Sequence, residues 1–135
     1  MDAQNEVLHS LKDGKAYNKF VEMINYQKGN LDLLRVSDNI VEIKSEKEGY
    51  INNIDALKIG EASMKLGSGR INKEDNILYG VGIELVKNIG DYVNVGDTIA
   101  KVYVGKTIDY NDVRSAFTID KEKKEKEKLI YGIIK

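Results

Sequence analysis

Apolar residues in the first third of the chain recur at helical spacing. Between residues 15 and 26 they fall at steps of three and four, which predicts an amphipathic helix over this range. Its apolar positions are Ala16, Phe20, Met23 and Ile24. Asp13 is the expected cap at its start, and Gly29 is the expected left-handed residue after its end. Residues 1–11 are predicted to form an earlier helix.

Beyond residue 39 the pattern changes to an alternation with a period of two, which is typical of half-buried strands. The predicted strands cover residues 40–44, 50–54, 81–85, 98–104, 117–119 and 129–134. Two helices interrupt them, one over residues 56–66 with Asp55 as its cap and Gly67 as its end, and a short one over residues 109–115. Because strands and helices do not alternate as βαβ units, this order indicates the α+β class.

The change of pattern near residues 37–39 divides the chain into a helical segment over residues 1–38 and an α+β domain over residues 39–135. A length of 135 residues fits one domain with a short appended segment. The formal net charge of −1 gives no long-range field that would attract nucleic acid or an anionic membrane. No apolar run approaches the ~18 residues of a membrane span, so we expect a cytoplasmic protein that binds neither nucleic acid nor membrane.

Cysteine is absent from the sequence, and His9 is its only histidine. Thiolate catalysis, disulfides and Cys-based zinc sites are therefore excluded, and a transition-metal site is not expected. No group of residues combines a nucleophile, a base and an oxyanion site. The sequence predicts no catalytic residue, no metal ligand and no cofactor.

The dipeptide Gly-Asp occurs twice in close succession, at residues 90–91 and 96–97. Glycine supplies the positive φ angle that tight turns need, and the aspartate side chain binds the backbone of its own turn. The pattern predicts two turns within a small, strongly bent sheet of the barrel-sandwich type.

The stretch Glu-Ala-Ser-Met-Lys-Leu at residues 61–66 offers two interpretations of Lys65. Biotin carrier domains present their modified lysine in a similar Met-Lys context, and paired Gly-Asp turns are also typical of biotinyl and lipoyl domains. A carrier lysine, however, lies at the tip of a turn between two strands, whereas the residues before Lys65 have helical spacing and a cap. The pattern favours an exposed helix lysine. The alternative is an autonomous carrier or interaction module with Lys65 as its attachment site.

The stretch Leu-Gly-Ser-Gly-Arg at residues 66–70 is the candidate binding element of the chain. It contains Gly67, Ser68, Gly69 and Arg70. Successive backbone N–H groups in such a loop can surround an anion, and an arginine adds two parallel donors. The spacing lacks the pattern of a P-loop or of a dinucleotide-binding fingerprint. Taken alone, it favours a mobile connection in which Arg70 pairs with Glu74 or Asp75.

Three stretches together resemble the C-terminal third of the pyrimidine-nucleoside phosphorylase and thymidine phosphorylase family. The first, SLKDGKAYNKFVEMINYQKGN, is similar to the last helix of that family's large α/β domain. The second, IGEASMKLGSGRINKEDNILYGVGIELVKNIGDYVNVGDTIAKVY, is similar to its signature LGAGR…KED…VGI…GD.V..GD.LA, and the third is VRSAFTI. The departures are few. Lys28-Gly29-Asn30 stands where Gly-Gly-Asp is common, and Ser68 stands where alanine is common.

The resemblance implies a hammerhead or barrel-sandwich C-terminal domain, preceded by the end of a large α/β domain. Enzymes of the family cleave pyrimidine nucleosides with phosphate as co-substrate and release the base and a pentose 1-phosphate. Their phosphate-binding region, pyrimidine-binding residues and potassium site lie upstream of the matching part, so this chain is expected to be inactive alone. The determinants of a preference for thymidine or uridine are likewise not in it.

The resemblance also implies partners and a role for the glycine loop. The expected partner is the remainder of the parent chain, mainly the large α/β domain, within a parent homodimer. The apolar face of the helix over residues 15–26 is then expected to be exposed wherever that domain does not cover it. Gly67, Ser68, Gly69 and Arg70 correspond to a loop near the family's cleft that moves as the domains close, which implies a gating element. Lys65 corresponds to a variable helix position.

Overall fold

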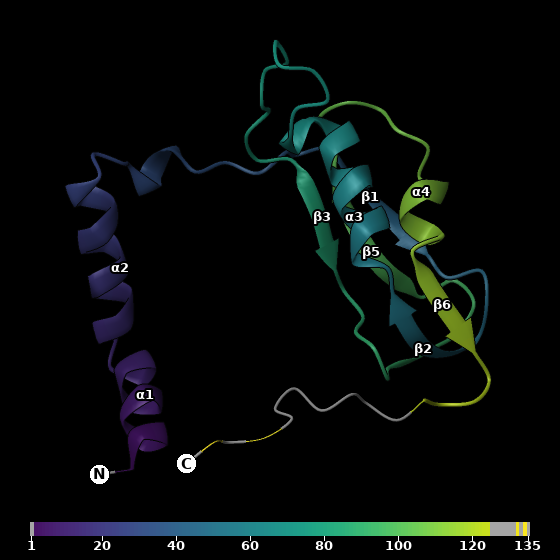
Figure 1. Cartoon of the computed structure of the whole chain (residues 1–135), viewed down its shortest axis with the longest axis horizontal. Coiled ribbons are helices and arrows are strands. Elements are labelled where there is room, and N and C mark those ends of the chain that lie inside the picture. The colour runs from purple at the N-terminus through teal and green to yellow at the C-terminus, as the bar shows by residue number, and fades with distance from the viewer. Residues whose placement is uncertain (1, 125–131, 133, 135) are drawn as a thin grey trace. The chain divides into compact units, whose positions relative to one another are not determined.

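The computed structural model of the chain describes residues 2–124, 132 and 134 (Figure 1). The chain divides into two compact units, Met1–Arg35 and Val36–Lys135, which we call the helical unit and the sheet unit. The strand predicted over residues 129–134 lies almost entirely outside the described residues. In the part of the chain that the structure describes, no helix is long and apolar enough to cross a membrane.

The helical unit consists of two helices and one short turn of 3-10 helix. These are α1 (Ala3–Lys12), α2 (Lys15–Tyr26) and η1 (Leu31–Leu33). Both predicted helices are confirmed, and α2 has the predicted bounds. Neither α1 nor α2 contains a buried residue. The apolar stripe that predicted α2 therefore remains partly exposed, with Phe20 and Met23 exposed and Ala16 and Ile24 half-buried.

The ends of α2 differ from the prediction. Gly14, with a φ angle of 80°, takes the capping position, while Asp13 accepts a hydrogen bond from the first amide of the helix at 3.0 Å. After the helix, Lys28 and not Gly29 adopts the left-handed conformation, with a φ angle of 59°. A β-carbon at Gly29 would lie 2.8 Å from Ile24 Cγ2, so this glycine serves a close approach to the helix.

Two antiparallel three-stranded sheets form the framework of the sheet unit. Sheet A has the strand order β1 (Ile40–Lys44), β5 (Thr98–Tyr103) and β3 (Gly82–Leu85). Sheet B has the strand order β4 (Tyr92–Val93), β2 (Gly49–Ile54) and β6 (Phe117–Asp120). The strands predicted within the described residues are confirmed, and β4 is an additional short strand. Two such sheets with separate helices confirm the α+β class.

Backbone hydrogen bonds at one residue, Ser45, link the two sheets. In sheet A, Lys44 pairs with Thr98, and in sheet B, Tyr50 pairs with Tyr92. Between these pairs, backbone hydrogen bonds of 2.8 and 2.9 Å join Ser45 to the turn that precedes β5. A β-bulge between Ile43 and Lys44 shifts the register within sheet A, and the hydrogen bonds of Ser45 then connect the end of sheet A to the start of sheet B.

The two Gly-Asp turns are built alike, as predicted. Gly90 and Gly96 have φ angles of 91° and 90°. In each turn the aspartate carboxylate accepts a hydrogen bond from the amide three residues earlier, at 2.8 Å for Asp91 and 2.9 Å for Asp97. This arrangement closes both turns without help from distant side chains.

The core of the sheet unit combines both sheets with α3 (Ala56–Ser63) and α4 (Asn111–Arg114). Its buried members are Ile43, Ile51, Ala62, Leu66, Val93, Ile99, Ala100, Val102, Val104, Val113, Ala116 and Phe117. Asp55 caps α3 as predicted, because its carboxylate accepts a hydrogen bond from the Lys58 amide at 3.1 Å. The predicted helix over residues 56–66 is not regular to its end. Its last turn widens into a π-helical segment, η2 (Met64–Ser68).

Candidate functional site

The glycine loop begins at the end of η2, where the backbone of Gly67 adopts a positive φ angle. Gly67 has a φ angle of 107°, which confirms that it ends the helix. The carbonyl of Leu66 accepts a hydrogen bond from the Lys106 amide at 2.9 Å, and that of Gly67 accepts one from the Leu78 amide at 2.8 Å. The base of the loop is thus held by the segment before β3 and by the segment after β5.

Two glycines allow these backbones to approach so closely. A β-carbon at Gly67 would lie 2.8 Å from Leu78 Cδ1, in addition to the strain of its positive φ angle. A β-carbon at Gly105 would lie 2.8 Å from the carbonyl oxygen of Leu66 and 2.7 Å from Val81 Cγ1. Neither position has room for a side chain, so the loop base is a tightly packed element.

The middle of the loop is tied to its own helix. Ser68 Oγ donates a hydrogen bond to the carbonyl of Ser63 at 2.8 Å and lies 2.7 Å from the Ser63 hydroxyl. Gly69 is extended, and a β-carbon there would lie 3.1 Å from Met64 Cγ. The hydroxyl of Ser68 therefore acts in the loop as a local brace, with its hydrogen-bonding capacity used within the protein.

Arg70 begins the exposed part of the loop. Among the described residues no ion pair joins Arg70 to Glu74 or Asp75, so the predicted pairing is wrong. Asp75 instead accepts hydrogen bonds from the amides of Asn72 and Ile71, at 2.8 and 3.0 Å. These backbone hydrogen bonds lower the pKa of Asp75 from its ordinary value of 3.8. The carboxylate that was expected to bind the arginine thus closes a turn.

Lys65 lies on the outer side of η2, away from the core, as predicted. Its ammonium group is 2.7 Å from the Asp112 carboxylate, and this hydrogen bond raises the pKa of Lys65 from its ordinary value of 10.5. The residue belongs to a helical segment and not to a turn between two strands. This geometry does not support the carrier interpretation, in which an arm must extend from the tip of a hairpin.

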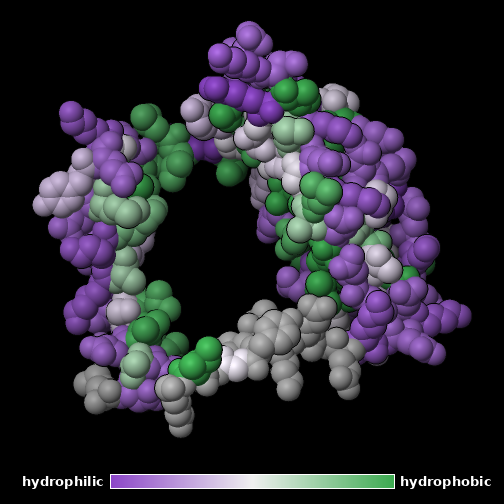
Figure 2. Space-filling view, in the orientation of Figure 1, coloured by the Kyte–Doolittle hydropathy of each residue, from purple (hydrophilic) through white to green (hydrophobic). Residues whose placement is uncertain are grey.

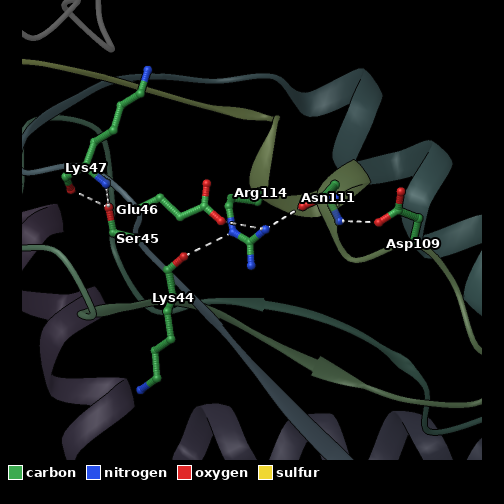
Figure 3. A network of polar contacts seen from close by, with 7 residues as sticks. All are labelled: Lys44, Ser45, Glu46, Lys47, Asp109, Asn111 and Arg114. Carbon is green, nitrogen blue, oxygen red and sulfur yellow. Dashed lines mark hydrogen bonds and ion pairs between the residues drawn. The ribbon is translucent and has the colours of Figure 1, made fainter.

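A second polar cluster, which the sequence did not indicate as a site, surrounds Arg114 (Figure 3). The Arg114 Nε donates a hydrogen bond to the carbonyl of Lys44 at 3.3 Å, and Nη1 donates one to Asn111 Oδ1. Nη1 also lies 3.1 Å from Glu46 Oε1. The cluster joins α4 to the loop between β1 and β2, at the mouth of a pocket of about 250 Å³. Its sequence signal was weak, because Lys44 and Glu46 lie about 70 positions before Arg114 in the chain.

The described residues contain no group of three or more His, Cys, Asp or Glu side chains that could hold a metal ion. His9 lies on the surface of α1, with Nε2 3.5 Å from Asp13 Oδ2. The polar side chains at the glycine loop, Ser63, Ser68 and Asp75, are hydrogen-bonded within the loop and its helix. The arrangement therefore serves to hold and to present a loop.

The family model described as "Pyrimidine nucleoside phosphorylase C-terminal domain" matches residues 50–120, which is more than half of the chain. The chain belongs to this family. The matched range contains the whole glycine loop and all strands except β1 and the first residue of β2, so the family assignment covers the candidate site. The resemblance inferred from the sequence is confirmed.

Named relatives extend the match beyond the family model. A pyrimidine-nucleoside phosphorylase of Staphylococcus epidermidis is 36% identical over 98% of this chain and 33% of its own length. A thymidine phosphorylase of Metamycoplasma hominis is 35% identical over 80% of this chain and 42% of its own length. A pyrimidine-nucleoside phosphorylase of Staphylococcus aureus is 33% identical over 83% of this chain and 27% of its own length. The chain spans about a third of the length of these relatives.

Proposed function

We propose that this chain is the C-terminal part of a cytoplasmic pyrimidine-nucleoside phosphorylase. The parent enzyme would be a pentosyltransferase that uses phosphate to cleave a pyrimidine nucleoside into free base and pentose 1-phosphate. The observation that carries the proposal is the family match over residues 50–120, together with the relatives' alignment through the helical unit. The test is to express these residues with the whole upstream reading frame of their gene and to assay phosphate-dependent cleavage of uridine and thymidine. A longer chain that cleaves neither would overturn the proposal.

The chain alone contributes no chemistry in this proposal. The chain's coverage of only 33% of the length of its Staphylococcus epidermidis relative supports this. The purified chain of 135 residues should show no phosphorolysis of uridine above the rate without protein. The Staphylococcus epidermidis enzyme serves as the positive control, and phosphate-dependent turnover by the short chain would contradict this part of the proposal.

The sheet unit has the hammerhead or barrel-sandwich architecture in this proposal. The two small antiparallel sheets linked at Ser45 and the paired Gly-Asp turns support that assignment. Within it, Gly67, Ser68, Gly69 and Arg70 act as a gating element near the substrate cleft of the parent enzyme. Their anchored base and exposed end support this role, because a gate needs a fixed hinge and a free tip.

The gating role can be tested in the full parent enzyme. Arg70→Ala should change kcat and KM together, because the tip would close less completely over the substrate. Lys73→Ala is the matched control, since Lys73 is another exposed cation on the same loop. If Arg70→Ala leaves both constants unchanged, or if Lys73→Ala alters them equally, the glycine loop is not the gate.

The partner of the helical unit would be the large α/β domain of the same parent chain, within a homodimer. The apolar face of α2 supports this, because Phe20 and Met23 are 44% and 46% exposed although they lie on the amphipathic stripe. The test is a comparison of the short chain and the parent enzyme by hydrogen exchange. The amides of α2 should exchange much more slowly in the parent, and equal exchange would contradict the docking.

A further inference from the structure

A pocket lies between the β1–β2 loop, α4 and the edge of sheet B, away from the glycine loop. Its volume is about 250 Å³, and it is lined by segments that are far apart in the sequence. Ile99, Phe117 and Ile119 supply an apolar lining. Of these, Ile99 is fully buried, Phe117 is 9% exposed and Ile119 is half-buried, so Ile119 and the edge of Phe117 offer the accessible apolar surface. The lining includes two cations, Lys47 and Arg114, against one carboxylate.

Arg114 is held in place from two sides at the mouth of this pocket. Its hydrogen bonds to the Lys44 carbonyl and to Asn111 fix the plane of the guanidinium group, and its side chain is 30% exposed. In the part of the chain that the structure describes, Nη2 has no hydrogen-bond partner. The free donors are those of Nη2, which lies beside Nη1, so a carboxylate that replaced Glu46 on Nη1 would reach both nitrogens of the fixed guanidinium.

The carboxylate of Glu46 is a weakly held partner of this arginine. Its oxygen lies 3.1 Å from Arg114 Nη1, but the Glu46 side chain is 71% exposed. Ion pairs at such an exposed position contribute little, because water and salt screen them and a long side chain must be ordered. A second carboxylate that also reaches Nη2 and places an apolar body in the pocket would displace Glu46.

We propose that this pocket is a binding site for a small organic anion, a carboxylate on an apolar body, with Arg114 as its anchor. The pocket is somewhat smaller than the ~300–1,000 Å³ that is usual for drug-sized ligands, so the body is limited to about one ring or one branched chain. The carboxylate binds the guanidinium, the body lies against Phe117 and Ile119, and Lys47 adds positive charge at the rim. This site is independent of the proposed phosphorylase activity.

The test is an NMR titration of the full 135-residue chain with benzoate. Benzamide is the control ligand, because it has the same ring and nearly the same shape but no charge. Benzoate should shift the signals of Ile99, Phe117 and Ile119, and benzamide should bind at least roughly tenfold more weakly. Equal affinity for the two ligands, or shifts that map to another surface, would overturn the proposal.

Two charge-neutralising variants on one loop sharpen the test. Glu46→Gln should strengthen benzoate binding roughly two- to fivefold, because it removes the internal competitor. Glu48→Gln is its matched control, since Glu48 is exposed, lies on the same loop and does not line the pocket. If both variants change the affinity equally, the effect is one of net charge and the displacement of Glu46 is refuted.

Removal of the anchor gives the reciprocal result. Arg114→Gln should weaken benzoate binding by roughly tenfold or more and leave benzamide binding unchanged. Arg114→Lys keeps the positive charge but lacks the two parallel N–H donors of the guanidinium. Its benzoate affinity should therefore fall between those of the original chain and Arg114→Gln. Unchanged benzoate affinity in a folded Arg114→Lys or Arg114→Gln chain would overturn the assignment of the anchor.

Discussion

The helical unit and the sheet unit use the same kind of sequence pattern with opposite results. In both, apolar residues recur on one side of each element, and in both the predicted elements form. Only the sheet unit covers its apolar side, with twelve buried apolar residues, whereas α1 and α2 bury none. Figure 2 shows apolar side chains gathered along one side of the helical unit. Periodicity thus predicts an element, but a partner surface decides whether the element contributes to stability.

Truncation of one large apolar residue in each unit should show the largest contrast. Leu66→Ala removes a fully buried side chain from the sheet unit and should lower the free energy of unfolding by about 3 kcal/mol. Phe20→Ala in α2, where the side chain is 44% exposed, should lower it by well under 1 kcal/mol. Urea unfolding followed by circular dichroism measures both. Equal losses would mean that the helical unit has a core of its own.

Two glycine substitutions within the sheet unit should differ in sign. Gly105→Ala places a methyl group against the Leu66 carbonyl and Val81, and should cost about 2 kcal/mol through overpacking. Gly60→Ala lies within α3, where a β-carbon meets nothing within 4 Å, and should stabilise the chain by about 0.5–1 kcal/mol. The midpoints of urea unfolding report both changes. A stabilising Gly105→Ala would show that the loop base has room for a methyl group at this position.

Acid should loosen the exposed end of the loop before it affects the core. The pKa of Asp75 is lower in the folded state than in the unfolded state. The stability that its carboxylate gives to the turn is therefore present above the unfolded pKa of 3.8 and is lost as the pH falls through the folded pKa. The amides of Ile71 and Asn72 should therefore lose protection from exchange below pH 3.8, while that of Val93 keeps it. Asp75→Asn should abolish this pH dependence at the two amides. An unchanged acid response in that variant would assign it to another group.

The smallest effect is expected from the exposed ion pair between Lys65 and Asp112. The pKa of Lys65 is higher in the folded state than in the unfolded state. The stability that the ion pair contributes is therefore fully present below the unfolded pKa of 10.5 and is lost as the pH rises through the folded pKa. Because both side chains are partly exposed, Lys65→Gln should leave the urea midpoint at pH 7 unchanged within error. A clear shift of the midpoint would mean that this contact between η2 and α4 holds the two segments together.

Features that depend on local chemistry were predictable from the sequence. The bounds of α2, the cap at Asp55 and both Gly-Asp turns follow from the spacing and conformational preferences of neighbouring residues. The left-handed position after α2 was assigned to Gly29, because the sequence does not show that this glycine must instead make room for Ile24. Lys28 takes the positive φ angle in its place.

Features that depend on contacts between distant segments were not predictable. The Arg114 cluster forms only where the β1–β2 loop contacts α4, and neither segment contains a sequence motif that predicts this contact. The prediction that Arg70 pairs with Glu74 or Asp75 was wrong for a related reason. A carboxylate close in sequence was available, but the backbone amides of its own turn compete for it more effectively than a flexible arginine does.

The link between sheets A and B at Ser45 also affects how the sheet unit folds and opens. The neighbouring pairing of Lys44 with Thr98 closes a long stretch of chain, which is entropically costly and slows folding relative to a simple hairpin. Since β1 is followed directly by β2, and β4 directly by β5, the same two segments of chain supply strands to both sheets, and misalignment in one sheet hinders pairing in the other. Both sheets should therefore open as a single cooperative unit. The amides of Ile43 in sheet A and Ile51 in sheet B should report the same free energy of opening.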